Sequence, residues 1–130
     1  MKNDTGRCIV VDMDFEAAVA EVSHAIRDEG LQPLARIDVR DEFWRDLRKD
    51  FRRYYLIEAM APELAYDTLR ADLDAGVALP IIFAVYELAD GETAVVAKEP
   101  ASRRERDRVA NVFARLGRAS TGGPSGRVAA

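Results

Sequence analysis

The 130-residue sequence predicts a single α+β domain whose sheet is largely antiparallel. Several stretches repeat apolar residues at helical spacing, and two β-prone apolar runs, 79–88 and 93–97, meet across Asp90-Gly91 in the pattern of a β-hairpin. Helices mixed with strands that are adjacent in sequence favour an antiparallel sheet with helices packed on one face. The expected element order is β-α-β-(α)-β-α-β-β-α, within a domain that spans residues 1–119.

The first helix is expected to begin at Phe15, directly after a short strand over residues 7–13. Asp14 can cap this helix by accepting hydrogen bonds from the free backbone N–H groups of its first turn. Gly30 can end the helix, and Pro33 prevents it from resuming. The apolar stripe of the helix is formed by Phe15, Val19, Val22 and Ile26.

The middle of the chain is expected to alternate strands with short helices. Residues 34–39 alternate in polarity and predict a strand with one buried face. Asp41 can cap a short helix after this strand. Residues 53–60 predict a third strand, and Pro62 fits the first position of the next helix. The apolar positions of the strand at 34–39 are Ala35, Ile37 and Val39.

The C-terminal third combines the hairpin with a last helix. Asp90-Gly91 tolerates the positive φ angles of a type I′ turn. Ser102 and Glu105 form a capping box, which opens a helix that Gly117 can end. Residues 120–130 are rich in Gly, Ser and Pro, and such a segment cannot offset the entropy lost on ordering. We therefore expect a flexible tail over residues 120–130.

The run at residues 79–88 is apolar on both faces of the expected strand, whereas an antiparallel strand with one wet face should alternate. The expected helices suffice to cover only one face of the sheet. We therefore expect a second copy of the chain to cover the other face, in a homodimer. The candidate dimer contacts are Ile82, Ala84, Tyr86 and Leu88.

The charge balance argues against several classes of partner. The chain has 19 basic and 23 acidic residues, a formal net charge of −4. A mildly acidic protein is a poor candidate for binding nucleic acids or anionic membranes in general. Near the N-terminus the longest apolar stretch, Cys8 to Val11, is far shorter than a secretory or membrane-spanning segment. A soluble, cytoplasmic protein is expected.

The single cysteine and single histidine exclude an intramolecular disulfide, a multi-cysteine zinc site and every constellation that needs two histidines. Cys8 is interpreted as a structural residue of the first strand. His24 lies off the apolar stripe of its helix, between Glu21 and Asp28, and is interpreted as a surface residue. Since the sequence has no glycine-rich phosphate-binding motif, no cofactor is expected.

Four segments, at residues 15–39, 59–72, 79–88 and 90–100, occur in an order and spacing that resembles a known family. Over residues 7–118 the sequence is similar to the small bacterial and archaeal "domain of unknown function 302" family. The resemblance implies a β-α-β4-α arrangement with a TATA-binding-protein-like fold, usually seen as a homodimer, and no established activity. The fold label does not imply DNA binding, because function resides in sites and not in folds.

The sequence departs from this family at one position that bears on chemistry. Family members commonly carry Cys-Asn-Pro before the middle helix, where this chain has Met60-Ala61-Pro62. The helix-starting proline is kept, but the thiol is replaced by a thioether. A thiol or metal role on the family cysteine therefore does not carry over to this chain.

Charged and tyrosine residues within the expected strands are the candidate ligand-binding residues, because buried charges are tolerated only when they are paired or hydrogen-bonded. These candidates are Arg36, Asp38, Tyr54, Glu58 and Tyr86. No catalytic or metal-ligating residue is predicted. The expected function is a homodimeric, non-catalytic binding or regulatory module for a small molecule or a protein partner.

Two alternatives remain open from the sequence. A small enzyme could use strand carboxylates such as Asp38 or Glu58 as acid and base, which requires two such groups within reach of one pocket. A weak nucleic-acid binder could use the arginine clusters at residues 45–53 and 103–108, which requires both clusters on one face. Acidic residues interrupt both clusters and weaken their field, so binding of nucleic acid is not favoured.

Overall fold

The computed structural model describes residues 6–120 and 127–128 of the chain. The expected order of elements is confirmed, and the structure adds a 3-10 helix and a short last strand that the sequence did not predict. The elements are β1 (Gly6–Val11), α1 (Phe15–Asp28), β2 (Gln32–Asp38), α2 (Val39–Leu47), β3 (Tyr54–Met60), α3 (Pro62–Ala71), the 3-10 helix η1 (Leu73–Ala78), β4 (Ile81–Ala89), β5 (Glu92–Lys98), α4 (Arg103–Ala119) and β6 (Arg127–Val128).

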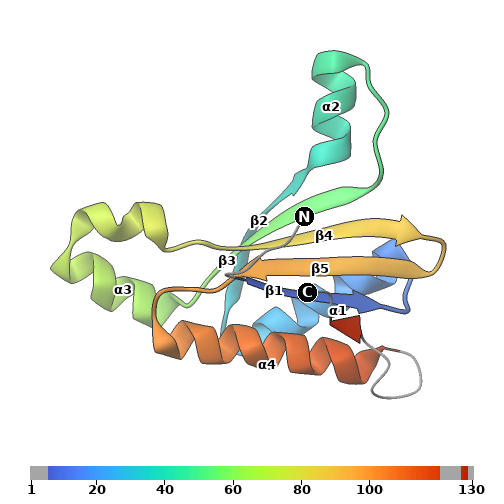
Figure 1. Cartoon of the computed structure of the whole chain (residues 1–130). Coiled ribbons are helices and arrows are strands. Elements are labelled where there is room, and N and C mark those ends of the chain that lie inside the picture. The colour runs from blue at the N-terminus through green and yellow to red at the C-terminus, as the bar shows by residue number, and fades with distance from the viewer. Residues whose placement is uncertain (1–5, 121–126, 129–130) are drawn as a thin grey trace.

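The strands form one sheet in the order β2-β3-β4-β5-β1-β6, and each pair of neighbours is antiparallel. Helices α1 and α4 lie side by side on one face of this sheet (Figure 1). The predicted α+β class, with a largely antiparallel sheet and helices on one face, is confirmed.

The hydrophobic core lies between the sheet and this pair of helices. The strands contribute side chains that alternate along each strand, so that Ile81, Phe83 and Val85 of β4 are buried. Helix α1 contributes the predicted apolar stripe, in which Phe15, Val19, Val22 and Ile26 are all buried. Helix α4 contributes Val109, Val112, Phe113 and Leu116.

Local capping interactions explain where α1 and α4 begin. The Asp14 Oδ1 atom accepts a hydrogen bond from the backbone N–H of Ala17 at 3.0 Å, as expected. The Ser102 Oγ atom accepts from the backbone N–H of Glu105 at 3.3 Å. Helix α4 continues through Gly117 to Ala119, so the expected end at this glycine is wrong.

Two further local predictions, on the cap of α2 and on the β4–β5 turn, are also wrong. Helix α2 is capped by Asp38, whose Oδ1 accepts from the Asp41 N–H at 2.9 Å, and not by Asp41 itself. In the β4–β5 turn only Gly91 has a positive φ, of 76°, whereas a type I′ turn requires positive φ at both central residues. The ladder accommodates this turn through a register shift between Glu87 and Ala89.

Strand β2 lies at the edge of the sheet, and none of its residues is buried. The buried face expected for residues 34–39 is therefore wrong. As an edge strand, β2 has a neighbouring strand on one side only, and its contacts with α1 do not bury it. Ile37 remains 39% exposed although it sits at an apolar position of the alternation.

Two arms extend from the sheet (Figure 1). Helix α2 rises on the side away from α4 and contains no buried residue. Helices α3 and η1 pack against each other and project from the end of the sheet at which β4 begins. They leave Leu73 and Val77 among the most exposed apolar side chains, at 84% and 94%.

Part of the expected tail at residues 120–130 is placed in the fold. Ser120 is buried, and its hydroxyl accepts a hydrogen bond from the Asp12 N–H at 3.0 Å. Residues 127–128 pair with Ile9 and Val10 as β6. The remaining residues of this segment, 121–126 and 129–130, lie outside the described residues, and their flexibility stays a prediction.

Candidate functional site

No described helix covers the face of the sheet opposite α1 and α4, and we call this face the open sheet face. Strand registers assign its residues, because directly opposed residues of neighbouring strands share a face. These residues are Cys8, Val10, Ile37, Tyr54, Leu56, Glu58, Ile82, Ala84, Tyr86, Ala94, Val96 and Lys98.

An apolar row crosses the middle of the open sheet face. Ile37 of β2 opposes Leu56 of β3, Leu56 opposes Ala84 of β4, and the row continues to Val96 of β5 and Cys8 of β1. Each of these side chains retains some exposure to solvent. The sheet therefore presents a strip of apolar side chains, five strands wide, that the described helices do not cover.

A tyrosine pair stands beside this apolar row. Tyr54 and Tyr86 oppose each other, and their rings stack with centroids 5.2 Å apart and an interplanar angle of 17°. Burial raises the pKa of the Tyr86 phenol above its ordinary value, and the neighbouring Cys8 and Tyr54 add to the rise while Arg52 opposes it. This phenol is therefore kept neutral, as suits a group in contact with other side chains.

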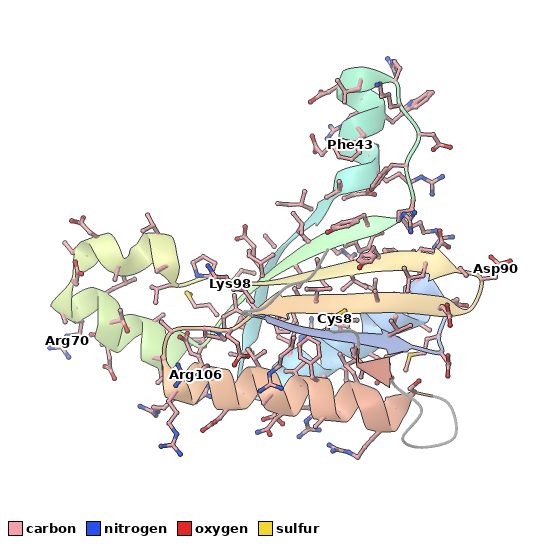
Figure 2. The ribbon with its side chains drawn as sticks, in the orientation of Figure 1. Cys8, Phe43, Arg70, Asp90, Lys98 and Arg106 are labelled. Carbon is pink, nitrogen blue, oxygen red and sulfur yellow. The ribbon has the colours of Figure 1, made fainter. Side chains whose placement is uncertain are left out.

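The aromatic contacts continue from the tyrosine pair to α2. Phe51 lies 6.3 Å from Tyr54 between ring centroids, and Phe43 meets Phe51 edge-on at 5.1 Å. Phe43 belongs to α2, which stands clear of the helical layer (Figure 2). Contacts between aromatic rings therefore connect α2 to the open sheet face.

Two opposite charges lie on the other side of the apolar row. Glu58 of β3 opposes Ile82 of β4, and Lys98, the last residue of β5, opposes Gly6 of β1. Because Phe83 opposes Ala97, the position of Ile82 is next to that of Lys98 across the β4–β5 ladder. Glu58 and Lys98 thus flank Ile82 from its two neighbouring strands.

The four candidate dimer contacts lie along β4, as the sequence indicated. Ile82, Ala84 and Tyr86 are on the open sheet face. Ile82 is 38% exposed, while Ala84 and Tyr86 are half-buried. Leu88 lies at the register shift before the turn and is 42% exposed.

The five candidate ligand-binding residues do not gather in one pocket. Tyr54, Glu58 and Tyr86 lie on the open sheet face, but Arg36 opposes Ile57 and Asp38 opposes Tyr55, which places both on the opposite face. Whether any of the five binds a ligand stays a prediction.

Arg36 and Asp38 contact other residues near the N-terminus of α2. The Arg36 guanidinium lies 4.8 Å above the centre of the Tyr55 ring, and Asp38 caps α2. Asp38 also borders a cavity of about 320 Å³ with Glu16 and Arg53, which pair at 3.3 Å. Because Asp38 and Glu58 lie on opposite faces, these two carboxylates cannot act together as acid and base on one substrate.

The two arginine clusters lie on opposite sides of the molecule. Residues 45–53 belong to α2 and the loop after it, and residues 103–108 open α4, on the other side of the sheet (Figure 1). Arg45 pairs with Asp41 and Glu42. Arg108 pairs with Glu63 and also donates to the carbonyl of Gly30. The single basic face that nucleic-acid binding required is not formed.

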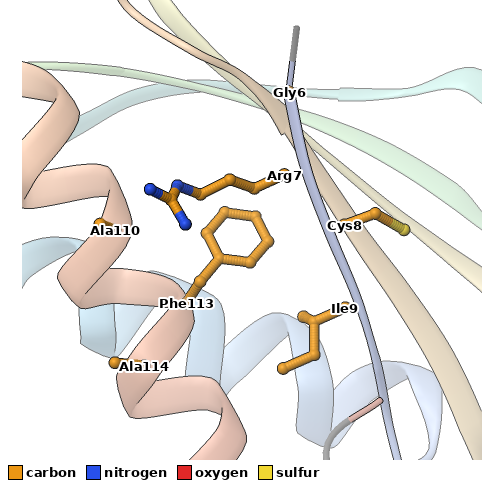
Figure 3. A pocket seen from close by; sticks show the side chains of 7 residues that line it. All are labelled: Gly6, Arg7, Cys8, Ile9, Ala110, Phe113 and Ala114. Atoms are coloured by element: carbon orange, nitrogen blue, oxygen red, sulfur yellow. The ribbon is translucent and has the colours of Figure 1, made fainter. Parts of the chain in front are cut away.

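A cavity of about 390 Å³ lies between β1 and α4 (Figure 3). The Arg7 side chain extends from β1 toward α4 beside the ring of Phe113, while the Cys8 side chain points away from α4. The Arg7 Nε atom donates to Glu99 at 3.0 Å, so its charge is already paired. Among the described residues that line this cavity, the Cys8 thiol is the one nucleophile, and its side chain points away from α4.

The lone histidine pairs with its own helix. The His24 Nε2 atom lies 3.6 Å from Asp28, and the His24 side chain is 73% exposed, which agrees with its interpretation as a surface residue. Within residues 6–120 and 127–128 no group of three His, Cys, Asp or Glu side chains could hold a metal ion. None of the helices in these ranges is long and apolar enough to cross a membrane.

Sequence reasoning missed Ile37, Leu56, Val96 and Lys98 as residues of the candidate surface. Their alternation was visible in the sequence, but the face to which each alternation belongs depends on the register between strands. Leu56 also lay in a run of ambiguous period. Only the pairing of Ala84 with both Leu56 and Val96 brings these residues into one row.

Comparison with known proteins agrees with the architecture. A search of curated proteins finds no match. Among solved structures, the crystal structure of an uncharacterized conserved DUF302 protein from Bacillus stearothermophilus is similar, with a TM-score of 0.68. The sequences are 18% identical, and the match covers 88% of this chain and 97% of the other. A likeness at this level of identity shows a shared fold.

A family model for the domain of unknown function DUF302 matches residues 8–120, close to the range over which the sequence resembled that family. The matched range contains the whole apolar row and both helices of the covered face. The chain therefore belongs to the DUF302 family.

Proposed function

We propose that this protein is a non-catalytic binding module that works as a homodimer, with two copies joined through their open sheet faces. The observation that carries the proposal is the apolar row from Ile37 to Cys8, which no described helix covers. Removing apolar surface from water is worth about 25 cal/mol per Å², so such a row favours association. A second copy presents the same row and can pack against it.

The charges beside the row favour a second copy over an unrelated partner. Glu58 and Lys98 lie on β3 and β5, the two neighbours of β4. If two sheets pack face to face about a two-fold axis that runs along β4, the axis places β3 of one copy over β5 of the other. Glu58 then lies over Lys98 of the second copy, and the same pair forms twice.

The arrangement that results has four layers, with helices outside and two sheets inside. Sheets that pack face to face lie about 10 Å apart, which apolar side chains of the size of Ile82 and Leu56 can fill. The small side chain of Ala84, at the centre of the row, lets the two β4 strands approach each other. The stacked Tyr54 and Tyr86 border the same interface.

Sedimentation velocity on wild type and two variants tests the proposal. Ala84→Arg places a long charged side chain at the centre of the open sheet face, and Leu73→Arg places the same side chain on the exposed η1 arm. We expect a dimer for wild type and Leu73→Arg and a monomer for Ala84→Arg. A wild-type protein that stays monomeric across the concentration range, or an Ala84→Arg dimer as stable as wild type, would contradict the proposal.

A further inference from the structure

A further cavity lies at the end of the sheet, between η1, the start of β4 and the first turn of α4. It has a volume of about 510 Å³, which is within the range of small-molecule sites. Its apolar wall comes from the chain between η1 and β4 and from β4 itself. The apolar lining residues are Val77, Ala78, Leu79, Pro80, Ile81 and Ile82.

One buried carboxylate lines this cavity. Glu105 is only 9% exposed to solvent, and it is the most buried charged residue among the described residues. Its backbone N–H is used by the Ser102 cap. Within residues 6–120 and 127–128, its carboxylate takes part in no hydrogen bond or ion pair, although a capping box would turn it back to the N–H of Ser102.

The cations near Glu105 are engaged elsewhere. Arg106 donates to the carbonyls of Pro100 and Ala101. Arg108 is bound to Gly30 and to Glu63. Burial raises the pKa of Glu105, and the charge of Arg108 opposes this rise without cancelling it. The cavity is therefore lined by a carboxylate that is partly desolvated, that keeps contact with solvent, and that forms no hydrogen bond or ion pair within the described residues.

Of the charged residues that line the cavity, Glu105 is the one available to pair with a cationic ligand. Glu99 is paired with Arg7 at 3.0 Å. Lys98 is exposed and belongs to the rim that the cavity shares with the open sheet face. An ionised carboxylate in an apolar setting is costly unless a cation pairs with it, and a ligand can supply that cation.

We propose that this cavity binds a small apolar amine, whose ammonium group pairs with Glu105 and whose hydrocarbon part packs against Val77, Leu79 and Pro80. The inference deepens the binding role proposed above but does not depend on the dimer. An α-amino acid with an apolar side chain shares this ammonium chemistry, and its carboxylate would reach Lys98 at the rim. The two sources are distinguished by the ligands used in the test.

The test is an NMR titration of the labelled full-length protein with 3-methylbutylamine, followed by the isosteric neutral alcohol 3-methylbutanol. We expect the amine to shift the amide signals of Glu105 and of residues 77–82, and to bind at least about tenfold more tightly than the alcohol. Alcohol binding equal to amine binding, or no shift at these residues with the amine, would overturn the proposal.

Two isosteric variants distinguish the contribution of Glu105 from that of Glu99. Glu105→Gln should weaken binding of the amine about tenfold or more and leave binding of the alcohol unchanged, because only the ammonium contact is lost. Glu99→Gln, at the other carboxylate of the lining, should bind the amine as wild type does. Amine binding to Glu105→Gln at wild-type affinity would overturn the assignment.

A measurement on wild type keeps the proposal testable if Glu105→Gln does not fold. The ¹³C signal of the Glu105 carboxyl reports its titration, and a bound ammonium should lower the pKa of this group. An unchanged titration with saturating amine would contradict the proposal. Sedimentation velocity on the same samples tests the dimer independently. The amine site can be confirmed while the dimer is disproved, and the reverse.

L-leucine identifies the source of the ammonium group. Tighter binding of leucine than of the amine, lost in Lys98→Gln, would support an apolar amino acid as the ligand. Binding of leucine equal to or weaker than that of the amine would support a simple amine. Both results support pairing of an ammonium group with Glu105, and the outcomes that would overturn this pairing are those of the amine and alcohol titrations.

Discussion

Tyr54 and Tyr86 stack on the open sheet face with their ring planes 17° apart and their centroids separated by 5.2 Å. The two residues oppose each other on β3 and β4, so the stack stiffens the ladder at the edge of the apolar row. Tyr86 is the member whose burial raises the pKa of the phenol. A neutral, partly desolvated phenol at this position suits a surface that a second copy covers in the proposed dimer.

The first prediction concerns the alkaline limit of stability. Because the pKa of Tyr86 in the folded protein is raised above its ordinary value of 10.0, the fold favours the neutral phenol. The unfolding free energy should therefore be intact below about pH 10 and decline as pH rises through the raised pKa. Denaturant unfolding of wild type and Tyr86→Phe measures this, and the variant should lose less stability above pH 10. Identical pH dependence in the two proteins would contradict the shift.

The second prediction uses the two charges that flank Ile82. Glu58→Lys alone places lysine over the Lys98 of a second copy, and Lys98→Glu alone places glutamate over Glu58. Each variant should dimerise about tenfold or more weakly than wild type, because two attractive contacts of about 0.5–1 kcal/mol become repulsive. Mixing the two variants should restore a heterodimer, since each variant then offers the charge that the other lacks.

Size-exclusion chromatography with light scattering measures this association for the separate and mixed samples. The double variant Glu58→Lys/Lys98→Glu is the matched control and should dimerise like wild type. If the mixture remains as monomeric as its components, the two-fold axis along β4 is wrong.

The third prediction concerns Glu105 and the pH dependence of folding. Burial raises the pKa of this carboxyl above 4.5, so the folded chain binds its proton more tightly than the unfolded chain does. The contribution of Glu105 to stability is therefore greatest below about pH 4.5 and declines as pH rises through the raised pKa. Glu105→Gln removes this decline and should melt at a higher temperature than wild type at neutral pH.

Thermal melts followed by circular dichroism check this prediction. The difference in Tm between Glu105→Gln and wild type should shrink as the buffer is acidified. Glu99→Gln, whose parent carboxylate is paired with Arg7, serves as the control and should show no such gain at neutral pH. A variant that is less stable than wild type at neutral pH would show that the ionised carboxylate stabilises the first turn of α4.

The fourth prediction concerns Gly30, which ends α1. Its φ is 77°, and an added Cβ would lie 3.1 Å from the Arg108 Nη1 atom, which itself donates to the Gly30 carbonyl. Gly30→Ala should lower the unfolding free energy by about 1–2 kcal/mol through backbone strain and this close contact. Gly117→Ala is the matched control, because that glycine is helical and its Cβ would meet only Ile9 at 3.7 Å. The control should stabilise by about 0.5–1 kcal/mol, and urea unfolding of both variants measures the contrast.

Local signals predicted the elements that depend on neighbouring residues. Asp14 and Ser102 begin α1 and α4 as expected, because a cap needs only its own first turn. The choice between Asp38 and Asp41 as the cap of α2 was different. It depends on where the pairing of β2 with β3 stops, and the last paired residue is Asp38, opposite Tyr55. That boundary is set by another strand.

Prediction of the candidate site from the sequence was limited in the same way, because it depends on how the strands pair. The apolar character of β4 on both faces indicated that its second face is covered, and Ile82, Ala84 and Tyr86 indeed share that face. The sequence also grouped Asp38 with Glu58, which the registers place on opposite faces. A one-residue difference in register reverses the face of every side chain, and single-sequence periodicity does not determine the register.

If two copies meet through the open sheet face, intermolecular NOEs between the protomers will connect residues of that face. Wild-type protein labelled with ¹³C is mixed with unlabelled protein, and isotope-filtered spectra record only contacts between copies. We expect intermolecular NOEs from the methyl groups of Leu56, Ile82, Ala84 and Val96. A dimer whose intermolecular NOEs come instead from the arm residues Leu73 and Val77, or a sample with no intermolecular NOE at all, would contradict it.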